Sequence, residues 1–219
     1  MIWEFDLLNT ATWLTHFDEF TRLPRGFQMQ LLQSIWHVWG RLYKVVETGR
    51  LRKTEELTGR HVQICNKYCL DLDKAKVETS WFSPYPLEQI QYFLGADKDG
   101  KWQLDDYIQP VSDLKLTDVE LTFMFAQLCF QHAGSRFLGE IKEVTDRFVQ
   151  ILANDLHDYY SIEKRKSPNY AGRLARILKI NQGIQSQIRG QREKAHIALT
   201  FDIFTADFSH PEMFSDTGC

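Results

Sequence analysis

The most informative part of this sequence is the stretch Trp13-Leu-Thr-His-Phe17-Asp-Glu-Phe20-Thr-Arg-Leu23-Pro-Arg-Gly-Phe27-Gln28-Met-Gln-Leu31-Leu32-Gln33-Ser-Ile-Trp36. From residue 27 onward its apolar residues fall three or four positions apart, and this spacing continues to residue 47. Such spacing places them on one face of a long helix, predicted over 27–47. The apolar arc is wide, so we expect this helix to be buried on more than one side. Its members are Leu31, Leu32, Ile35, Trp36, Trp39, Leu42, Tyr43 and Val46.

The same periodicity predicts three further helices. The first covers 117–132, with Thr117 as its N-cap and Glu120 three residues later in a capping-box arrangement. The second covers 135–160. The third begins after Pro168 and runs towards residue 204, although two internal glycines, at 183 and 190, weaken it locally.

The region between residues 48 and 116 carries weaker signals. The pairs Ser83-Pro84 and Tyr85-Pro86 break any helix near Trp81. Apolar residues at positions 87, 90 and 94 suggest a short helix behind these prolines.

Residues 97–100, Asp-Lys-Asp-Gly, form a turn signal. After this turn, Trp102, Leu104 and Tyr107 suggest a short strand or hairpin arm. The sequence as a whole therefore predicts an all-α fold with a small β element, arranged in layers rather than as a simple bundle.

Length and composition indicate one large folded domain. The chain has 219 residues, of which 43% are hydrophobic, enough to build a sizeable core. Its net charge of -3 provides no positive field for a phosphate backbone, so we expect no nucleic-acid contact by this chain. The apolar runs fall short of the roughly 20 residues of a membrane span, and we expect no membrane contact.

Motifs for catalysis or metal binding do not stand out. The four cysteines include one close pair, Cys65 and Cys69, without histidines at zinc-finger spacing, so we expect no zinc site and reduced thiols. The seven histidines are scattered, and neither a metalloprotease motif nor a nucleophile turn is present. We therefore do not expect an enzyme. The basic run at 163–166 is interpreted as a solvated loop.

The opening stretch resembles the signature of nuclear hormone receptor ligand-binding domains, in which helix 3 ends, a short loop follows and helix 4 begins. Later segments agree in order: 116–121 is similar to the start of the family's helix 8, 156–174 to the passage from helix 9 into helix 10, and 210–216 to the helix 12 region. The nematode members are the most similar. The matched signature positions are Trp13, Phe17, Phe20, Leu23, Gln28, Leu31 and Leu32.

The resemblance implies a groove for an amphipathic coregulator helix. In the family, a basic residue late in helix 3 and an acid in helix 12 clamp the ends of that helix through its dipole. Here the basic position falls on Thr15 and a supporting one on Gln33, so both are neutral, while Asp216 is the preferred acid because Pro211 suits a first helical turn. Glu212 in the acid position is the alternative register. The implied groove residues are Thr15, Leu23, Gln28, Leu32, Gln33, Met213, Phe214 and Asp216.

The resemblance also implies an apolar small-molecule pocket and a pairing surface. Trp36, Trp39 and Phe123 are candidate pocket residues, and such bulky side chains are also large enough to fill a pocket themselves. The position of the family's carboxylate anchor falls on Glu47, which does not favour a fatty-acid ligand. No cofactor is expected. The candidate dimer surface lies on the predicted last helix at Arg173, Ile177 and Ile184.

Trp13 matches a point near the end of the family's helix 3, although it lies only 12 residues from the start of this sequence. Helix 1, the start of helix 3 and the two-zinc DNA-binding domain are therefore expected to be missing, and the whole of 1–219 is expected to be one N-terminally truncated ligand-binding domain. A fragment, a truncated gene product and a degenerate receptor all remain open. The function implied is regulation of transcription in the nucleus. The alternative is a receptor-like interaction protein, unable to bind DNA, that dimerises with full receptors and has an empty or side-chain-filled pocket.

Overall fold

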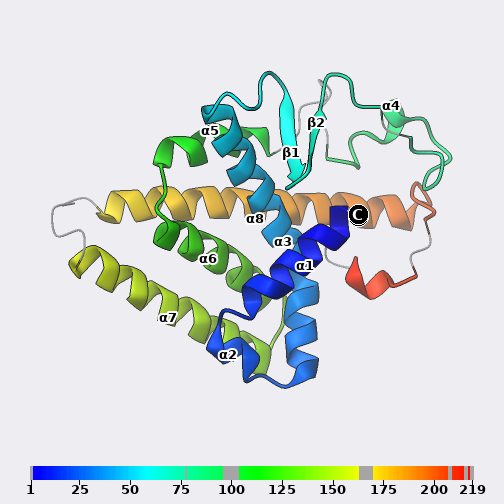
Figure 1. Ribbon diagram of the computed structural model, residues 1–219. Coiled ribbons are helices and arrows are strands. Elements are labelled where there is room, and N and C mark those ends of the chain that lie inside the picture. Colours follow the sequence, from blue (N-terminus) through cyan, green and yellow to red (C-terminus); the bar gives the residue numbers. More distant parts are fainter. Residues whose placement is uncertain are drawn as a thin grey trace.

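The computed structural model describes residues 2–76, 78–95, 104–162, 170–206, 209–214 and 217, with Ile2 described by its backbone only. It shows the predicted architecture, a layered all-α fold with one small two-stranded sheet (Figure 1). The elements are α1 (Ile2–Leu14), α2 (Asp18–Thr21), α3 (Arg25–Lys53), β1 (His61–Cys65), β2 (Tyr68–Asp71), α4 (Leu87–Ile90), α5 (Asp105–Leu114), α6 (Asp118–Arg136), α7 (Glu140–Ile162), α8 (Tyr170–Thr200) and the 3-10 helix η1 (Pro211–Met213).

Helix α3 is the central element and is longer than the predicted 27–47. It begins directly after Pro24, and Arg50, Arg52 and Lys53 in its last turn favour the carbonyl end of the helix dipole. Every residue from 34 to 40 is buried, so the expected burial on more than one side is confirmed. In Figure 1, α1 crosses in front of α3, and the sheet and α5 lie near its C-terminal end.

The aromatic residues of the signature join the N-terminal helices to the core. Trp13 stacks on Phe130 of α6 with ring centroids 5.8 Å apart, and Phe17 meets the same ring edge-on at 5.6 Å. Phe17 also stacks on Phe148 of α7. Pairs of this geometry stabilise beyond the area that they bury. The signature spacing thus serves the packing of α1 and α2 against α6 and α7.

The signature glutamine fixes the loop between α1 and α3. The side-chain nitrogen of Gln28 donates hydrogen bonds to the carbonyls of Phe20 (3.2 Å), Thr21 (3.2 Å) and Leu23 (3.0 Å). The carbonyls of Thr21 and Leu23 are satisfied in this way, and the carbonyl of Phe20 also accepts from the amide of Leu23 at 3.1 Å. Gln28 is therefore a structural residue of this loop.

Helix α6 begins as predicted. Thr117 is its N-cap, and Thr117 and Glu120 form both hydrogen bonds of the capping box. The next predicted boundary, at residue 135, is wrong, because α6 continues to Arg136 and α7 starts only at Glu140. Phe137 is extended and Gly139 has a φ of 69°, a left-handed conformation that glycine adopts without strain.

Helix α8 runs unbroken through both internal glycines. Tyr107 of α5 lies so close to Gly183 that a Cβ there would overlap its hydroxyl and ring. Glycine at this position therefore permits the close approach of α5 to α8. Nothing lies within 4 Å of the corresponding point at Gly190.

The location predicted for the β element is wrong. Tyr107 lies inside helix α5, Leu104 immediately precedes that helix, and Trp102 and the predicted turn at 97–100 lie outside the described residues. Helix α5 forms because its buried residues, Ile108, Val111 and Leu114, are three apart and Asp105 and Asp106 occupy its first turn. The hairpin instead consists of β1 and β2, which pair antiparallel with His61 opposite Asp71.

The segment around α4 is attached to the end of α8, and the predicted short helix there is confirmed as α4. Ile90 packs with Ala198 and Phe204 in a second apolar cluster. The hydroxyl of Ser83 donates to the carbonyl of Ile203 at 2.7 Å, and the amide of Thr205 donates to the carbonyl of Phe82 at 2.8 Å.

Candidate functional site

The C-terminal segment, residues 209–217 as far as they are described, lies against α3. Pro211 occupies the first turn of η1, as its sequence position suggests. The indole nitrogen of Trp36 donates to the carbonyl of Met213 at 3.1 Å, and the guanidinium of Arg41 donates to the carbonyl of Thr217 at 2.9 Å. Two side chains of α3 thus bind the backbone of the segment.

Phe214 adds an apolar contact to this attachment. Its ring meets Trp3 of α1 edge-on with centroids 4.9 Å apart, and it meets Trp36 of α3 at 5.9 Å and 90°. Thr217 is only 1% exposed. The segment therefore contacts both α1 and α3, in agreement with the place of η1 in Figure 1.

Arg41 is held in place from within the core. Its guanidinium donates to Nδ1 of His37 at 3.0 Å, so the histidine must present an unprotonated nitrogen. Burial, the nearby Arg41 charge and the facing ring of His132 hold the pKa of His37 well below its usual range. His37 is therefore neutral and orients Arg41 towards the C-terminal segment.

A buried ion pair holds α1 against α3. The Lys44 ammonium lies 2.5 Å from a carboxylate oxygen of Asp6, and the side chains are 16% and 4% exposed. Gly40 makes room for that carboxylate, because a Cβ there would come within 2.5 Å of it. The pair fixes the relative position of the two helices that also contact the C-terminal segment.

The residues implied for the coregulator groove fall into three groups. Thr15 is exposed and its hydroxyl donates to the carbonyl of Thr12 at 2.7 Å. Leu23 and Leu32 pack partly against the main core, and Gln33 is half-buried. Met213 and Phe214 are half-buried on α3, Gln28 holds the preceding loop, and Asp216 lies outside the described residues.

Two exposed apolar residues next to these positions were not predicted from the sequence. Leu8 of α1 is 57% exposed and Met29 of α3 is 50% exposed. Leu8 shares a helix face with exposed Thr12 and Thr15, and Met29 shares one with Gln33 and Trp36. The sequence does carry a signal for them, because Leu8 and Met29 lie at helical spacing from Thr15 and Gln33.

The candidate pocket residues lie in different environments. Trp36 faces the C-terminal segment, as described above. Trp39 stacks on Tyr43 at 5.2 Å and contacts Phe125 at 5.4 Å, and Phe123 is buried in the main core. Trp39 and Phe123 thus act as core side chains, and the three residues do not share one cavity lining among those described below.

The candidate dimer residues are used within the chain. Ile177 and Ile184 are both 0% exposed and belong to the main core. Arg173 binds Glu120 of α6, with a second contact of 2.8 Å from its Nη2. These side chains are therefore not free for a partner, and pairing through α8 stays a prediction that would have to use its exposed residues.

Glu120 is the centre of a buried polar network. It also accepts hydrogen bonds from Tyr160 of α7 and, at 2.8 Å, from the amide of Thr117. Burial alone would raise the pKa of this carboxyl, but the Arg173, Thr117 and Tyr160 donors outweigh burial and hold the pKa at about 2. The network ties α6, α7 and α8 together.

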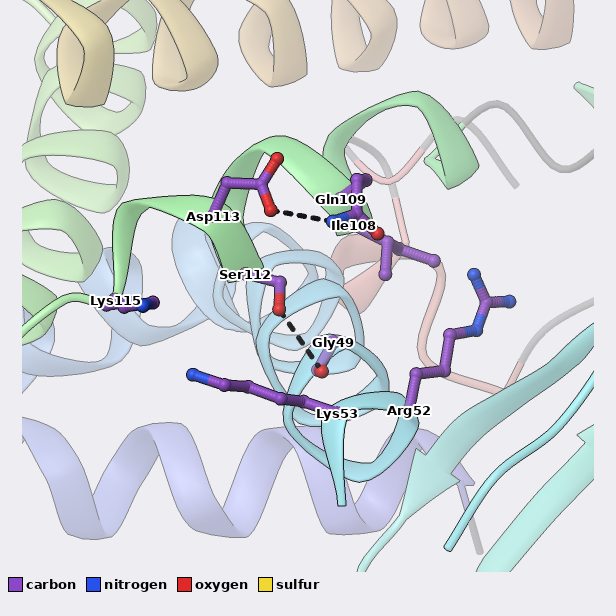
Figure 2. A pocket seen from close by; sticks show the side chains of 8 residues that line it. All are labelled: Gly49, Arg52, Lys53, Ile108, Gln109, Ser112, Asp113 and Lys115. Atoms are coloured by element: carbon purple, nitrogen blue, oxygen red, sulfur yellow. Dashed lines mark hydrogen bonds between the residues drawn. The ribbon is translucent and has the colours of Figure 1, made fainter. Parts of the chain in front are cut away.

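Three surface cavities accompany these features. One of about 360 Å³ lies between α3 and the hairpin and is lined by Glu47, which pairs with Arg50 at 3.0 Å. A second, of about 530 Å³, lies between α5 and α8. A third, of about 250 Å³, lies between the end of α3 and α5 and is drawn in Figure 2.

The described residues contain neither a helix that could span a membrane nor a cluster of side chains suited to a metal ion. No helix there is both long and apolar enough to cross a membrane. No cluster of three or more His, Cys, Asp or Glu side chains suited to a metal ion occurs in that part of the chain either.

Comparison with known proteins places the chain among receptors. Residues 1–201 match the family model described as the ligand-binding domain of nuclear hormone receptor. Nuclear hormone receptor family member nhr-106 of Caenorhabditis elegans is 50% identical over 221 residues, covering 100% of this chain and 57% of that protein. Members nhr-130 and nhr-90 of the same organism are 45% and 43% identical, over 99% of this chain and 48% and 54% of those proteins. The chain thus spans about half the length of these relatives.

Proposed function

Because this chain belongs to the family of nuclear hormone receptor ligand-binding domains, we propose that it regulates transcription in the nucleus as the part of a receptor that binds a small molecule and a coregulator helix. The observation that carries this proposal is the docking of the C-terminal segment on α3 by Trp36 and Arg41. A segment held at this place extends the surface that α1 and α3 present to a partner.

The proposed coregulator surface consists of residues in and directly after α1, residues of α3 and the docked C-terminal segment. The residues outside that segment are Leu8 and Thr12 on α1, Thr15 directly after α1, and Met29 and Gln33 on α3. Leu8 and Met29 supply apolar area, and Phe214 marks the end of the surface beside Trp36. An amphipathic helix buries its apolar face in such a groove. Since Thr15 and Gln33 are neutral, the usual charge clamp is incomplete, and apolar contacts supply most of the affinity.

The proposed ligand is an apolar small molecule without a carboxylate. Its affinity would come mainly from burial of apolar surface with a few orienting polar groups. Glu47 stands where the family's carboxylate anchor falls, and it lines the cavity beside the hairpin. Glu47 is an acid that pairs with Arg50, and it cannot itself act as the cationic anchor of a fatty-acid headgroup.

Peptide binding to the purified chain tests the coregulator surface. A fluorescent helical peptide with a Leu-x-x-Leu-Leu sequence is expected to bind, weakly, to the wild type. Met29→Arg should weaken binding about tenfold or more by removing apolar contact, and Trp36→Phe should weaken it by removing the donor to Met213. Ile162→Arg is the control, since Ile162 is 68% exposed at the last residue of α7.

Restoring the missing cation tests the interpretation of the clamp. Thr15→Lys should strengthen peptide binding several-fold, because the ammonium would meet the carbonyl end of the bound helix. Equal binding by wild type, Met29→Arg and Ile162→Arg would instead refute the proposed surface.

A second function, a dimerising interaction protein with a side-chain-filled pocket, has one specific observation in its favour. Four aromatic rings pack on one another between α1, α3 and α6, where they would fill the space that a ligand needs. They belong to Phe5, Trp39, Tyr43 and Phe125. Native mass spectrometry distinguishes the two functions, because a bound apolar molecule adds mass to the chain. Sedimentation of the same sample shows whether it dimerises.

A further inference from the structure

The cavity between α3 and α5 has a lining that is mostly basic and polar. Figure 2 shows Arg52 on one side of the contact between Ser112 and Gly49, with Lys53 and Lys115 extending on the other. The volume is about 250 Å³. Its residues come from the last turn of α3, from α5 and from the position directly after α5.

The charges of this lining do not cancel. Arg52, Lys53 and Lys115 provide three cations, Asp113 is the carboxylate of the lining, and Asp105 lies beside Arg52, which leaves an excess of one positive charge. Oδ1 of Asp113 accepts a hydrogen bond from Gln109 at 2.6 Å, which turns this carboxylate towards its own helix. In the described part of the chain, no ion pair engages Lys53 or Lys115.

Arg52 is positioned before any ligand arrives. Its guanidinium donates to the carbonyl of His61 in β1 at 3.1 Å and lies 3.9 Å from a carboxylate oxygen of Asp105. Its Nε is buried and has no hydrogen-bond partner among the described residues. A planar guanidinium held in this way keeps donors in a fixed orientation suited to an oxyanion.

Lys115 is the C-cap of α5 and lines the same cavity. Its backbone is left-handed, with φ of 46° and ψ of 56°, which costs free energy for a residue with a Cβ. The carbonyl of Lys115 accepts a hydrogen bond from Arg173, which helps to hold this conformation. Helices commonly end in this conformation, and the contact with Arg173 fixes the backbone of Lys115 beside the cavity.

We propose that this cavity binds a small oxyanion of the phosphate class, either inorganic phosphate or a phosphate monoester. Arg52 supplies oriented donors, Lys53 and Lys115 supply mobile ammonium groups, and Ser112 supplies a hydroxyl. The bound anion joins α3, α5 and, through Arg52, the hairpin. The site uses none of the residues of the proposed coregulator surface.

Calorimetric titration and thermal unfolding with inorganic phosphate and with glycerol phosphate test this proposal, at ionic strength fixed with chloride. The wild type is expected to show saturable binding and a rise in melting temperature with at least one of the two probes. Tighter binding of glycerol phosphate identifies the ester as the preferred form, and equal or weaker binding identifies free phosphate.

Two double variants, each lacking two positive charges, test whether the anion binds in this cavity. Lys53→Gln with Lys115→Gln should weaken binding about tenfold or more, since charge-assisted contacts are lost. The matched control, Arg176→Gln with Lys179→Gln, removes the same charge from the cavity between α5 and α8 and should leave the affinity unchanged. No saturable response beyond that to chloride, or equal weakening in both double variants, overturns the proposal.

Discussion

At the scale of single residues, buried polar side chains determine how the helices meet. Glu120 is buried and accepts hydrogen bonds from α7, from α8 and from the N-cap of its own helix, and Asp6 is buried against Lys44. Removing one partner of such a pair leaves an uncompensated charge, which costs more than the pair contributes. The capping box made the local role of Glu120 predictable, but its bonds to Arg173 and Tyr160 span 53 and 40 residues and leave no local pattern.

Glu120→Gln should lower the free energy of unfolding by about 3 kcal/mol, because Arg173 then loses its charged partner. Urea denaturation followed by circular dichroism measures this change. Glu143→Gln, at an exposed position of α7, is the control and should stay within about 0.5 kcal/mol of the wild type. Equal unfolding free energies for the two variants would contradict the role given to Glu120.

The chain should lose stability on acidification in two stages. The pKa of His37 is lowered in the folded chain. As the pH falls below about 6.5, His37 therefore binds a proton in the unfolded chain but not in the folded one, and stability declines. The pKa of Glu120 is about 2 against an ordinary 4.5, so its contribution is complete above pH 4.5 and is lost as the pH falls towards 2.

The urea concentration at the unfolding midpoint, measured at about every half pH unit between pH 8 and pH 3, follows both stages. In His37→Gln the amide oxygen still accepts from Arg41, but the first decline should flatten. An unchanged slope between pH 6.5 and pH 5 in that variant would show that His37 does not titrate on unfolding.

At the scale of elements, periodicity identified α3, α6 and α8, and it failed where two periods compete. Trp102 and Leu104 are two residues apart, as in a strand, yet Ile108, Val111 and Leu114 follow at a spacing of three within α5. The glycines of α8 show the same limit. In the sequence, a glycine weakens the prediction of a helix. The contact with Tyr107 that requires Gly183 exists only in the folded chain.

The two glycines of α8 should respond oppositely to alanine. Gly190→Ala should raise the free energy of unfolding by up to about 1 kcal/mol, because the new Cβ enters open space and alanine favours a helix. Gly183→Ala should destabilise the fold, since Tyr107 must move away from α8. Thermal unfolding of both variants compares them directly, and a stabilising Gly183→Ala would contradict the close packing of α5 on α8.

At the scale of the whole molecule, family resemblance predicted the fold and the order of its helices, and the match over residues 1–201 confirms that membership. The partner surfaces were less predictable. Ile177 and Ile184 satisfy the same apolar pattern whether they face a partner or the core, and only the fold shows that they face the core. The docking of the C-terminal segment depends on Trp36 and Arg41, whose partners are backbone carbonyls and therefore leave no sequence signature.

The central claim is that α1, α3 and the docked C-terminal segment form one partner-binding surface. Hydrogen–deuterium exchange of the full chain, with and without a saturating Leu-x-x-Leu-Leu peptide, tests this claim most directly. We predict slower exchange on peptide binding at residues 8–15, 23–36 and 209–217, with α7 unchanged. Protection confined to other elements, or no change in these three regions at saturation, would contradict the claim.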